Sequence, residues 1–428
     1  MRLELGEVFI NDVVFGKKTT IIDGKLVINK DELIQKLKDD RRIKDVEIDI
    51  ARPGEKVRII PVKDVIEPRV KVEGDGNGFP GVTHKIARVG QGKTNALKGV
   101  AVVTTGSIVG IQEGLIDMWG KGAEYTPFSK TCNVVVNIEP IDGIKEHEHE
   151  ETVRIAGLKA ASYLGEAGRA ITPDKVTVFE LESIADNIKK YPELPRVVYI
   201  EMLISQGLLH DTYIYGVDAK QILPTLIHPN EILDGAVVSG NCVAACDKIT
   251  TYQHQNNSVI LDLYEKHGRE LNFLGVILTN EKVTLEGKIR SCNYAAKLAR
   301  MLGAEGAIIT EEGYGNPDTD LLQICRELEK SGIKTVLITD ECAGRDGLSQ
   351  SLADAVPDAK AIISTGNVSH MVKLPAAEKV IGSEKAISNL SGGFDESLCE
   401  DGSILCELNA IIGSTSEIGF FNLTTRLY

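Results

Sequence analysis

The chain has 428 residues and a formal net charge of −14, because 62 aspartates and glutamates outnumber 48 lysines and arginines. No basic block stands out, so the charge pattern argues against nucleic acid or an anionic membrane surface as a partner. No apolar run approaches the roughly 20 residues needed to cross a bilayer, and the N-terminus lacks the features of a signal peptide. We therefore expect a cytoplasmic, globular protein of about two to four domains.

Short apolar runs separated by turn signals dominate residues 1–78. The runs are residues 8–10, 20–22, 25–28 and 46–50. Asp23-Gly24 between two of them predicts a hairpin, and one helix is expected from Lys30 to Asp39. The glycine-rich stretch 74–81 has the composition of a loop. We interpret residues 1–78 as a β-rich N-terminal module.

Longer apolar runs follow in residues 79–241, and we expect them to form buried strands. These runs are residues 100–103, 134–136, 176–179 and 197–200. Apolar positions from Val153 to Leu164 recur near a 3.6-residue period behind several acidic residues, which predicts a helix. Residues 233–239 read as an apolar strand. This second region is therefore expected to be α/β.

Strands and helices alternate more regularly in residues 242–428. The expected strands are residues 274–278, 307–309, 335–338 and 361–363, and the expected helices run from Cys292 to Leu302 and from Leu321 to Lys330. Such alternation implies right-handed crossovers and a doubly wound, mostly parallel sheet. Ligands bind beyond the carboxyl ends of such strands, so the turns after Thr310, Thr339 and Ser364 are candidate site walls. A helix N-cap is expected at Asp318 or Asp320.

Eight cysteines are scattered along the chain instead of being spaced as a disulfide framework. Cys242 and Cys246 are separated by three residues, but no second close pair accompanies them, so a zinc site would need distant ligands. His147 and His149 are two residues apart and would not share a helix face. The sequence therefore predicts reduced cysteines and no metal site.

The most informative segment is Gly240 to Asn257, with the sequence GNCVAACDKITTYQHQNN. Gly240 and Asn241 tolerate backbone conformations closed to most residues, so the peptide before Cys242 can be held in a strained turn. The Cys242 thiol could then attack the Asn241 carbonyl beside it. Thioester formation, elimination and hydrolysis would leave a ketone, a pyruvoyl group, at the new N-terminus. The alternative is a buried free cysteine in a loop.

Polar residues that follow Cys242 are candidates for supporting this chemistry. The attack requires a thiolate, so a base is expected nearby, and His254, Lys248 or Tyr252 could serve as that base or later hold the substrate. The Thr250 hydroxyl could stabilise an oxyanion or the ketone oxygen. For each residue, ordinary loop polarity is the alternative.

Three further side chains complete the candidate site. Thr251 could act on an oxyanion as Thr250 could, although threonine pairs before an aromatic residue are frequent in strands. Cys246 and Gln255 are candidates for contact with the substrate. Cys246 could also pair with Cys242 in an uncut chain, or it could simply pack.

The segment from Gly240 to Asn257 and the opening Met1-Arg2-Leu3-Glu4-Leu5-Gly6 resemble the component B proproteins of the glycine, sarcosine and betaine reductase family. The resemblance spans the chain and implies cleavage before Cys242 into alpha and beta chains, of residues 1–241 and 242–428. It further implies a pyruvoyl group that captures glycine as a Schiff base for reductive deamination. The implied partners are a selenocysteine-containing gamma subunit of component B, the small selenoprotein A, and component C, with acetyl phosphate and ammonia as products.

Three hypotheses follow. In the first, the chain is a self-processed pyruvoyl subunit of an oxidoreductase, with glycine ahead of sarcosine as the substrate; betaine would need a different capture step because a quaternary ammonium has no lone pair. In the second, a two-lobed α/β protein binds an amino acid without covalent capture. In the third, Cys242 and Cys246 form a thiol–disulfide couple in a nucleotide-binding protein. Only the first hypothesis predicts a cut chain.

Overall fold

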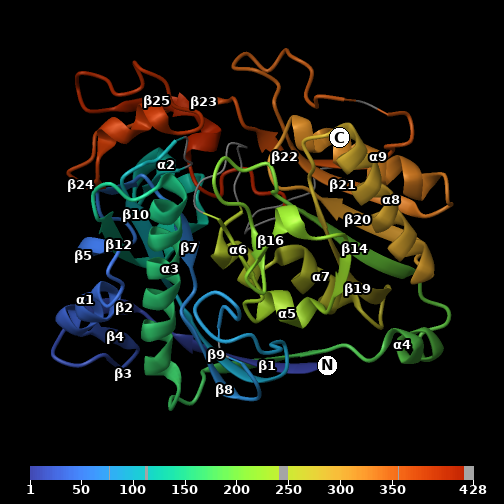
Figure 1. Cartoon of the computed structure of the whole chain (residues 1–428), viewed down its shortest axis with the longest axis horizontal. Helices are drawn as coiled ribbons and strands as arrows, with labels where there is room; N and C mark the ends of the chain where they lie inside the picture. Colours follow the sequence, from blue (N-terminus) through green and yellow to red (C-terminus); the bar gives the residue numbers. More distant parts are fainter. Residues whose placement is uncertain (77, 111–113, 241–248, 355, 419–428) are drawn as a thin grey trace.

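The computed structural model describes residues 1–76, 78–110, 114–240, 249–354 and 356–418 (Figure 1). These residues form a mixed α/β structure with several sheets, as the sequence predicts. None of the helices in these ranges has both the length and the apolar character of a membrane span. Within the same ranges, no group of three or more His, Cys, Asp or Glu side chains is placed to hold a metal ion.

Two four-stranded sheets occupy the N-terminal half, in the orders β13-β1-β9-β8 and β5-β12-β10-β7. Their strands are β1 (Arg2–Phe9), β5 (Ile43–Ala51), β7 (Asp64–Ile66), β8 (Arg69–Glu73), β9 (Gly92–Lys98), β10 (Val100–Gly106), β12 (Cys132–Pro140) and β13 (Lys175–Glu180). Strand β1 lies between β13 and β9, and β5 pairs with β12. Both sheets therefore combine strands from residues 1–78 with strands from residues 79–241.

Helices α1 (Lys30–Lys38) and α3 (Glu146–Gly165) pack on one face of the sheet that contains β5, and share an apolar core with it. Both helices confirm the sequence prediction. The expected hairpin is also present, because β3 (Thr20–Ile22) pairs antiparallel with β4 (Lys25–Ile28). Asp23 and Gly24 between them have φ values of 49° and 71°. Positive φ at both central positions is what a tight hairpin turn requires.

The remaining small sheets each have two or three strands in the described part of the chain. Their strands are β2 (Asp12–Phe15), β6 (Val57–Ile60), β11 (Ile116–Asp117), β15 (Tyr213–Ile214), β16 (Val217–Asp218), β18 (Val237–Val238), β23 (Met371–Leu374), β24 (Lys379–Gly382) and β25 (Ile404–Glu407). The short helices are α2 (Gly120–Glu124), α4 (Ile184–Lys190), α5 (Pro229–Leu233) and α6 (Thr251–Gln255).

A six-stranded, mostly parallel sheet forms the core of the C-terminal half, in the order β17-β19-β14-β20-β21-β22 (Figure 1). Its strands are β14 (Arg196–Leu203), β17 (Thr225–Ile227), β19 (Asn272–Asn280), β20 (Gly306–Thr310), β21 (Lys334–Glu341) and β22 (Ile362–Asn367). Helices α8 (Leu285–Met301) and α9 (Asn316–Glu329) pack on one face, and α5 and α7 (Ser258–Lys266) pack on the other. The strands and helices expected in this region are confirmed.

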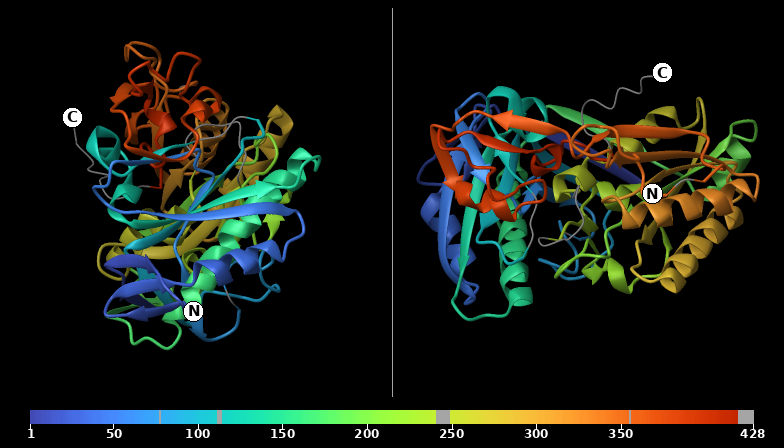
Figure 2. Two further views of the ribbon diagram at one scale, coloured as in Figure 1. Left: turned by 90° about the vertical axis from the view of Figure 1, so that its left-hand side faces the viewer. Right: turned by 90° about the horizontal axis from the view of Figure 1, so that it is seen from above.

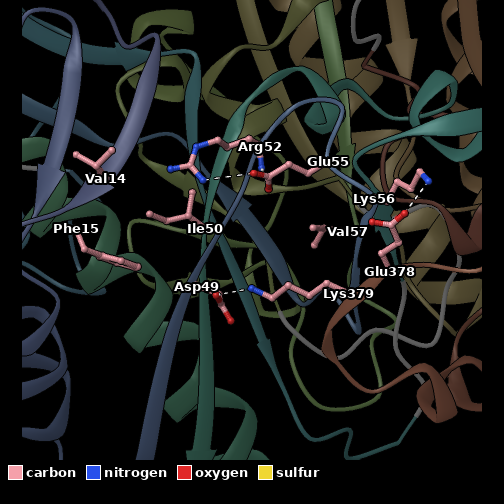
Figure 3. A pocket seen from close by; sticks show the side chains of 10 residues that line it. All are labelled: Val14, Phe15, Asp49, Ile50, Arg52, Glu55, Lys56, Val57, Glu378 and Lys379. Atoms are coloured by element: carbon pink, nitrogen blue, oxygen red, sulfur yellow. Dashed lines mark hydrogen bonds and ion pairs between the residues drawn. The ribbon is translucent and has the colours of Figure 1, made fainter.

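Residues before and after position 241 share sheets in both halves of the molecule. Strand β14 precedes this position but lies between β19 and β20, which follow it. Conversely, β24 follows the position and pairs in parallel with β6, so the C-terminal segment lies against the N-terminal half (Figure 2). The groove in Figure 3, of about 610 Å³, is lined by residues from both the N-terminal half and the C-terminal segment. Two ion pairs connect them there: Lys379 lies 2.7 Å from Asp49, and Glu378 lies 2.7 Å from Lys56.

The prediction of a strand over residues 233–239 was wrong for most of its length. Leu233 ends helix α5, and only Val237–Val238 form a strand. Pro229 stands in the first turn of α5, where its fixed φ favours a helix start. Gly235, at φ 93°, then turns the chain out of the helix.

Two further local predictions need correction. The strand near residues 176–179 exists as β13, but it lies at a sheet edge and, within the described ranges, pairs with β1 alone. Val176 is therefore 51% exposed and not buried. The N-cap of α9 is Gly315 and not an aspartate. Asp318 stands one turn inside the helix, where its Oδ1 accepts a hydrogen bond of 2.7 Å from the Gly315 N–H.

Candidate functional site

The strand order points to one edge of the six-stranded sheet. The sequence β19-β14-β20-β21-β22 corresponds to the order 2-1-3-4-5 of doubly wound sheets, in which ligands bind at the carboxyl ends of the first and third strands. In this chain those ends are Leu203 of β14 and Thr310 of β20. Glu311 and Glu312 follow Thr310 directly and are fully buried. The predicted site wall after Thr310 therefore consists of two buried carboxyl groups.

Four predicted site residues lie outside the described residues: Asn241, Cys242, Cys246 and Lys248. The described residues on both sides of them are held by hydrogen bonds. The Ser239 N–H donates to Thr251 Oγ1 at 3.0 Å, and the Ile249 N–H donates to Glu312 Oε1 at 3.3 Å. Both flanks of segment 241–248 are therefore anchored, one at Thr251 of α6 and the other at Glu312, which follows β20.

Gly240 contributes to the same anchoring. A Cβ atom at this position would lie 2.3 Å from the carbonyl oxygen of Asp211, which is closer than real Cβ contacts allow. The glycine thus permits a close approach of two backbone segments just before the candidate cleavage point.

Thr251 joins three segments of the chain. Its hydroxyl donates to Asp64 Oδ2 at 2.7 Å while accepting the Ser239 N–H, and its own N–H donates to Asp64 Oδ1 at 3.0 Å. Asp64 is the first residue of β7, and all three residues are buried. Because Asp64 accepts a hydrogen bond from it, the Thr251 hydroxyl is fixed in place and holds the Ser239 backbone, on the N-terminal flank of segment 241–248. Its predicted action on an oxyanion stays a prediction.

Two other predicted residues, Thr250 and Gln255, make hydrogen bonds within the fold. Thr250 caps α6, since its hydroxyl accepts the Gln253 N–H at 3.3 Å and donates to Gln253 Oε1 at 2.9 Å. The Gln255 amide pairs with the Glu67 backbone, accepting at 3.0 Å and donating at 3.2 Å. Their predicted roles toward an oxyanion or the substrate are not tested by these bonds and stay predictions.

Tyr252 packs edge-on against Phe128, with ring centroids 5.4 Å apart. Burial, together with the nearby Glu67 carboxylate, raises the pKa of the Tyr252 phenol well above its usual range. The phenol is therefore neutral at ordinary pH and is a poor base in this state.

His254 differs from its neighbours because part of its bonding capacity is unused. The ring is fully buried, and Nδ1 lies 3.1 Å from Glu201 Oε1. Its Nε2 and the second carboxyl oxygen, Glu201 Oε2, have no hydrogen-bond partner among the described residues. Burial would lower the pKa of His254, but the hydrogen bond and charge of Glu201 and the charges of Glu312 and Asp64 raise it. The imidazole therefore keeps its proton to a higher pH than usual.

The strand ends around this histidine are acidic and shielded from water. Glu281 follows β19 and accepts a hydrogen bond of 3.1 Å from the Glu312 N–H. Burial and the neighbouring Glu312 and Glu311 carboxyls raise the pKa of Glu281 well above its usual range. Burial raises the pKa of Glu311 in the same direction. Glu312 accepts hydrogen bonds from the Ile204 N–H at 2.9 Å and from the Thr212 hydroxyl at 2.8 Å, so its carboxyl group connects the segment that follows β14 to the end of β20.

Sequence reasoning missed Glu201, Asp64 and Glu312. A signal was present for Glu201, because it is the one carboxylate inside the apolar run 197–203, and buried charges rarely lack a partner. Helix α6 is the element that brings the set together. It contacts Asp64 of one N-terminal sheet through Thr251, and Glu201 of the six-stranded sheet through His254.

A family model described as glycine/sarcosine/betaine reductase component B subunits matches residues 1–426. The chain is 60% identical over 430 residues to the glycine reductase complex component B subunits alpha and beta of Acetoanaerobium sticklandii, and 57% identical over 428 residues to the protein of that name from Peptoclostridium acidaminophilum. It is 55% identical over 428 residues to the sarcosine reductase complex component B subunit alpha of Peptoclostridium acidaminophilum. Each alignment covers 100% of both chains. No solved structure matches.

Proposed function

Because this chain belongs to the family of glycine/sarcosine/betaine reductase component B subunits, which are parts of oxidoreductase complexes, we propose that it is the substrate-capturing subunit of an amino-acid reductase. In this proposal the chain cuts itself between Asn241 and Cys242. Glycine is the assigned substrate, as in the names of two relatives, and sarcosine is the alternative, as in the name of the third. The assigned partners are a selenocysteine-containing gamma subunit, the small selenoprotein A and component C.

The observation that carries the proposal is the naming of full-length relatives. A single chain that aligns from end to end with this one is named for two subunits, alpha and beta. One polypeptide with two subunit names is expected for a proprotein that is cut. The sequence supplies a nucleophile and a carbonyl for such a cut at Cys242 and Asn241.

The described residues fit a pyruvoyl group at Cys242. When present, such a group supplies a ketone that binds an amine and withdraws electrons from the substrate's α-carbon. Thr251 and Glu312 would hold the two flanks of the reacting segment, through their contacts with Ser239 and Ile249. His254 Nε2 would be available to move a proton, because it is buried and unused. Fully buried polar atoms without partners are uncommon in folded proteins, and a catalytic role is one of the explanations for them.

The shared sheets support a working unit of two chains after the cut. A break between residues 241 and 242 would leave β14 of the first chain between β19 and β20 of the second. It would also leave β24 of the second chain paired with β6 of the first. Loss of one connection changes mainly chain entropy, so the two chains should remain together.

Mass spectrometry of the purified protein tests the proposal. We expect fragments of residues 1–241 and 242–428 that co-migrate in native mass spectrometry, with the second fragment blocked to Edman degradation. Borohydride should attach glycine to the second fragment, and parallel samples with sarcosine and betaine would define the substrate. The Cys242→Ala variant should stay uncut and bind no amine, because alanine removes the attacking sulfur.

A full-length chain with a free Cys242 thiol, recovered from an active complex, would refute the proposal. An intact chain that binds glycine reversibly would instead support non-covalent binding, and an intact chain with a Cys242–Cys246 disulfide would support a redox couple. Normal cleavage of the alanine variant would exclude processing by Cys242.

A further inference from the structure

The Glu201–His254 pair joins the two sides of the proposed cut. Glu201 lies in β14, before position 241, and His254 lies in α6, after it. Both side chains are fully buried, and the Nδ1 to Oε1 distance is 3.1 Å. The pair therefore exists only when the two proposed chains are assembled.

We infer that Glu201 is a positioning residue for His254, and that His254 Nε2 moves the proton of the substrate amine during capture. This inference rests on the proposed function. Its first support is geometric: the carboxylate occupies Nδ1, so the neutral ring carries its proton on Nδ1 and its lone pair on Nε2. Its second support is that Nε2 is buried without a partner among the described residues, although such atoms nearly always have one.

The location of His254 connects it to the reacting segment. The two other carboxylates that act on its charge are Asp64 from β7 and Glu312 after β20. These two residues also hold the flanks of segment 241–248, Asp64 through Thr251 and Glu312 through Ile249. The carboxylates that act on the charge of the imidazole are thus the ones that hold the described flanks of this segment.

An amine arrives mainly as an ammonium ion at neutral pH, and its nitrogen has no lone pair until one proton is removed. His254 Nε2 would accept that proton, and Glu201 would stabilise the imidazolium that results. The carbon–nitrogen bond then forms while the carbonyl carbon–oxygen bond breaks. The oxygen leaves as water with two protons: His254 returns the one it took, and the amine nitrogen gives up a second as it forms its double bond to carbon. The nitrogen keeps the positive charge, so no proton is gained or lost overall.

This proton transfer defines the class of substrate. A primary or secondary amine has an N–H proton that His254 can take, and a quaternary ammonium has none. The carboxylates that face the ring from β14, β7 and the end of β20 stabilise the imidazolium that forms once the neutral ring has taken this proton. Together they also favour the approach of a cationic amine over a neutral or anionic compound.

The Glu201→Gln variant tests the inference, because glutamine keeps the shape and one acceptor oxygen but removes the charge. We expect the rate at which cyanoborohydride attaches glycine, normalised to the amount of cut 242–428 chain, to fall about 10- to 100-fold. The matched control is Ser291→Ala, which removes a buried 2.7 Å hydrogen bond to Asn280 and has no contact with the pair. Its trapping rate should equal that of the unmodified chain.

A second measurement does not depend on capture. Nitrogen-15 NMR of the uncut Cys242→Ala chain can follow the titration of the His254 ring, assigned by comparison with a His254→Gln sample. With Glu201 replaced by glutamine in this chain, the His254 pKa should fall and the Nδ1 tautomer preference should weaken. A purely structural role for Glu201 would not move this titration.

The outcomes separate this inference from the proposed function. Unchanged trapping and an unchanged His254 titration in the Glu201→Gln variant would overturn the inference. A wild-type chain that is never cut would overturn the proposed function, while the NMR titration would still report on the pair. If the glutamine variant does not fold, His254→Gln replaces it, and trapping at the wild-type rate in that variant would overturn the inference.

Discussion

Thr251 offers the sharpest test of how the fold prepares the candidate cleavage point. Thr251→Val keeps the shape of the side chain and the backbone contact with Asp64 but removes the hydroxyl. The lost bonds are the 2.7 Å donation to Asp64 Oδ2 and the 3.0 Å acceptance from the Ser239 N–H. The first involves a carboxylate, and both are buried.

The magnitude follows from these two bonds. A hydrogen bond to a charged group contributes about 1.5–3 kcal/mol and a neutral one about 1 kcal/mol, so the variant should lose about 2–4 kcal/mol of stability. If about 2 kcal/mol of this holds Ser239 in the reactive arrangement, the rate of cleavage should fall about 30-fold. The second flank, held by Glu312 at Ile249, is untouched, so cleavage should slow without stopping.

The assay is a time course of cleavage after a pulse of expression, with the fraction cut read by intact mass. Thr279→Val is the matched control, because the Thr279 hydroxyl is fully buried and has no hydrogen-bond partner among the described residues. That control should be as stable as the unmodified chain or more so, and should be cut at the same rate. Equal cleavage rates for the Thr251 variant and the control would refute the idea that the Thr251 hydroxyl holds Ser239 in the reactive arrangement.

Two further predictions concern stability, measured by urea unfolding of the uncut Cys242→Ala chain. Arg58→Met should lower the free energy of unfolding by about 3–5 kcal/mol, because it removes the partner of the buried Asp117 carboxylate, which lies 2.7 Å from Arg58 Nε. Adding Asp117→Leu to this variant should recover most of the loss. An unchanged free energy of unfolding in the single variant would contradict this prediction. Asp211→Asn should flatten the pH dependence, because burial raises the pKa of Asp211 from 3.8 to about 6. Between these pH values the folded chain keeps a proton that the unfolded chain releases, so the free energy of unfolding falls as pH rises from about 4 to about 7. The variant should abolish up to about 3 kcal/mol of that fall. An unchanged slope of the free energy of unfolding against pH would contradict this prediction.

Local signals in the sequence predicted helices α1, α3, α8 and α9 and five strands of the six-stranded sheet correctly, but missed shorter or less regular elements such as β9 and β17. The hairpin at Asp23-Gly24 and helices α1, α3, α8 and α9 depend on turn residues and on periodicity within a short window. The C-terminal sheet was predictable for the same reason, because alternating strands and helices leave few possible topologies.

Partner strands distant in sequence could not be predicted in this way. Whether β13 lies at an edge or β14 lies in the centre depends on which strands pair, and residues 176–179 and 197–200 both read as buried runs. The site shows the same limit. His254 was a candidate because it stands near Cys242, but Glu201 lies 53 residues away and becomes relevant only after β14 is placed beside α6.

The position of the proposed acid–base pair, Glu201 and His254, bears on why the proposed cut of one chain into two would be compatible with function. If the first chain were only a leader, its removal would leave His254 without Glu201, and the six-stranded sheet without its strand between β19 and β20. The backbone hydrogen bonds of β19 and β20 would then be exposed, and an isolated second chain could not keep this sheet. The proposed cut instead falls between two anchored flanks, where it would free one chain end and would break no strand pairing among the described residues. In the proposed function, cleavage at this point would change the chemistry of the terminus at residue 242, while the fold would still supply Glu201 and His254 from opposite sides of the break.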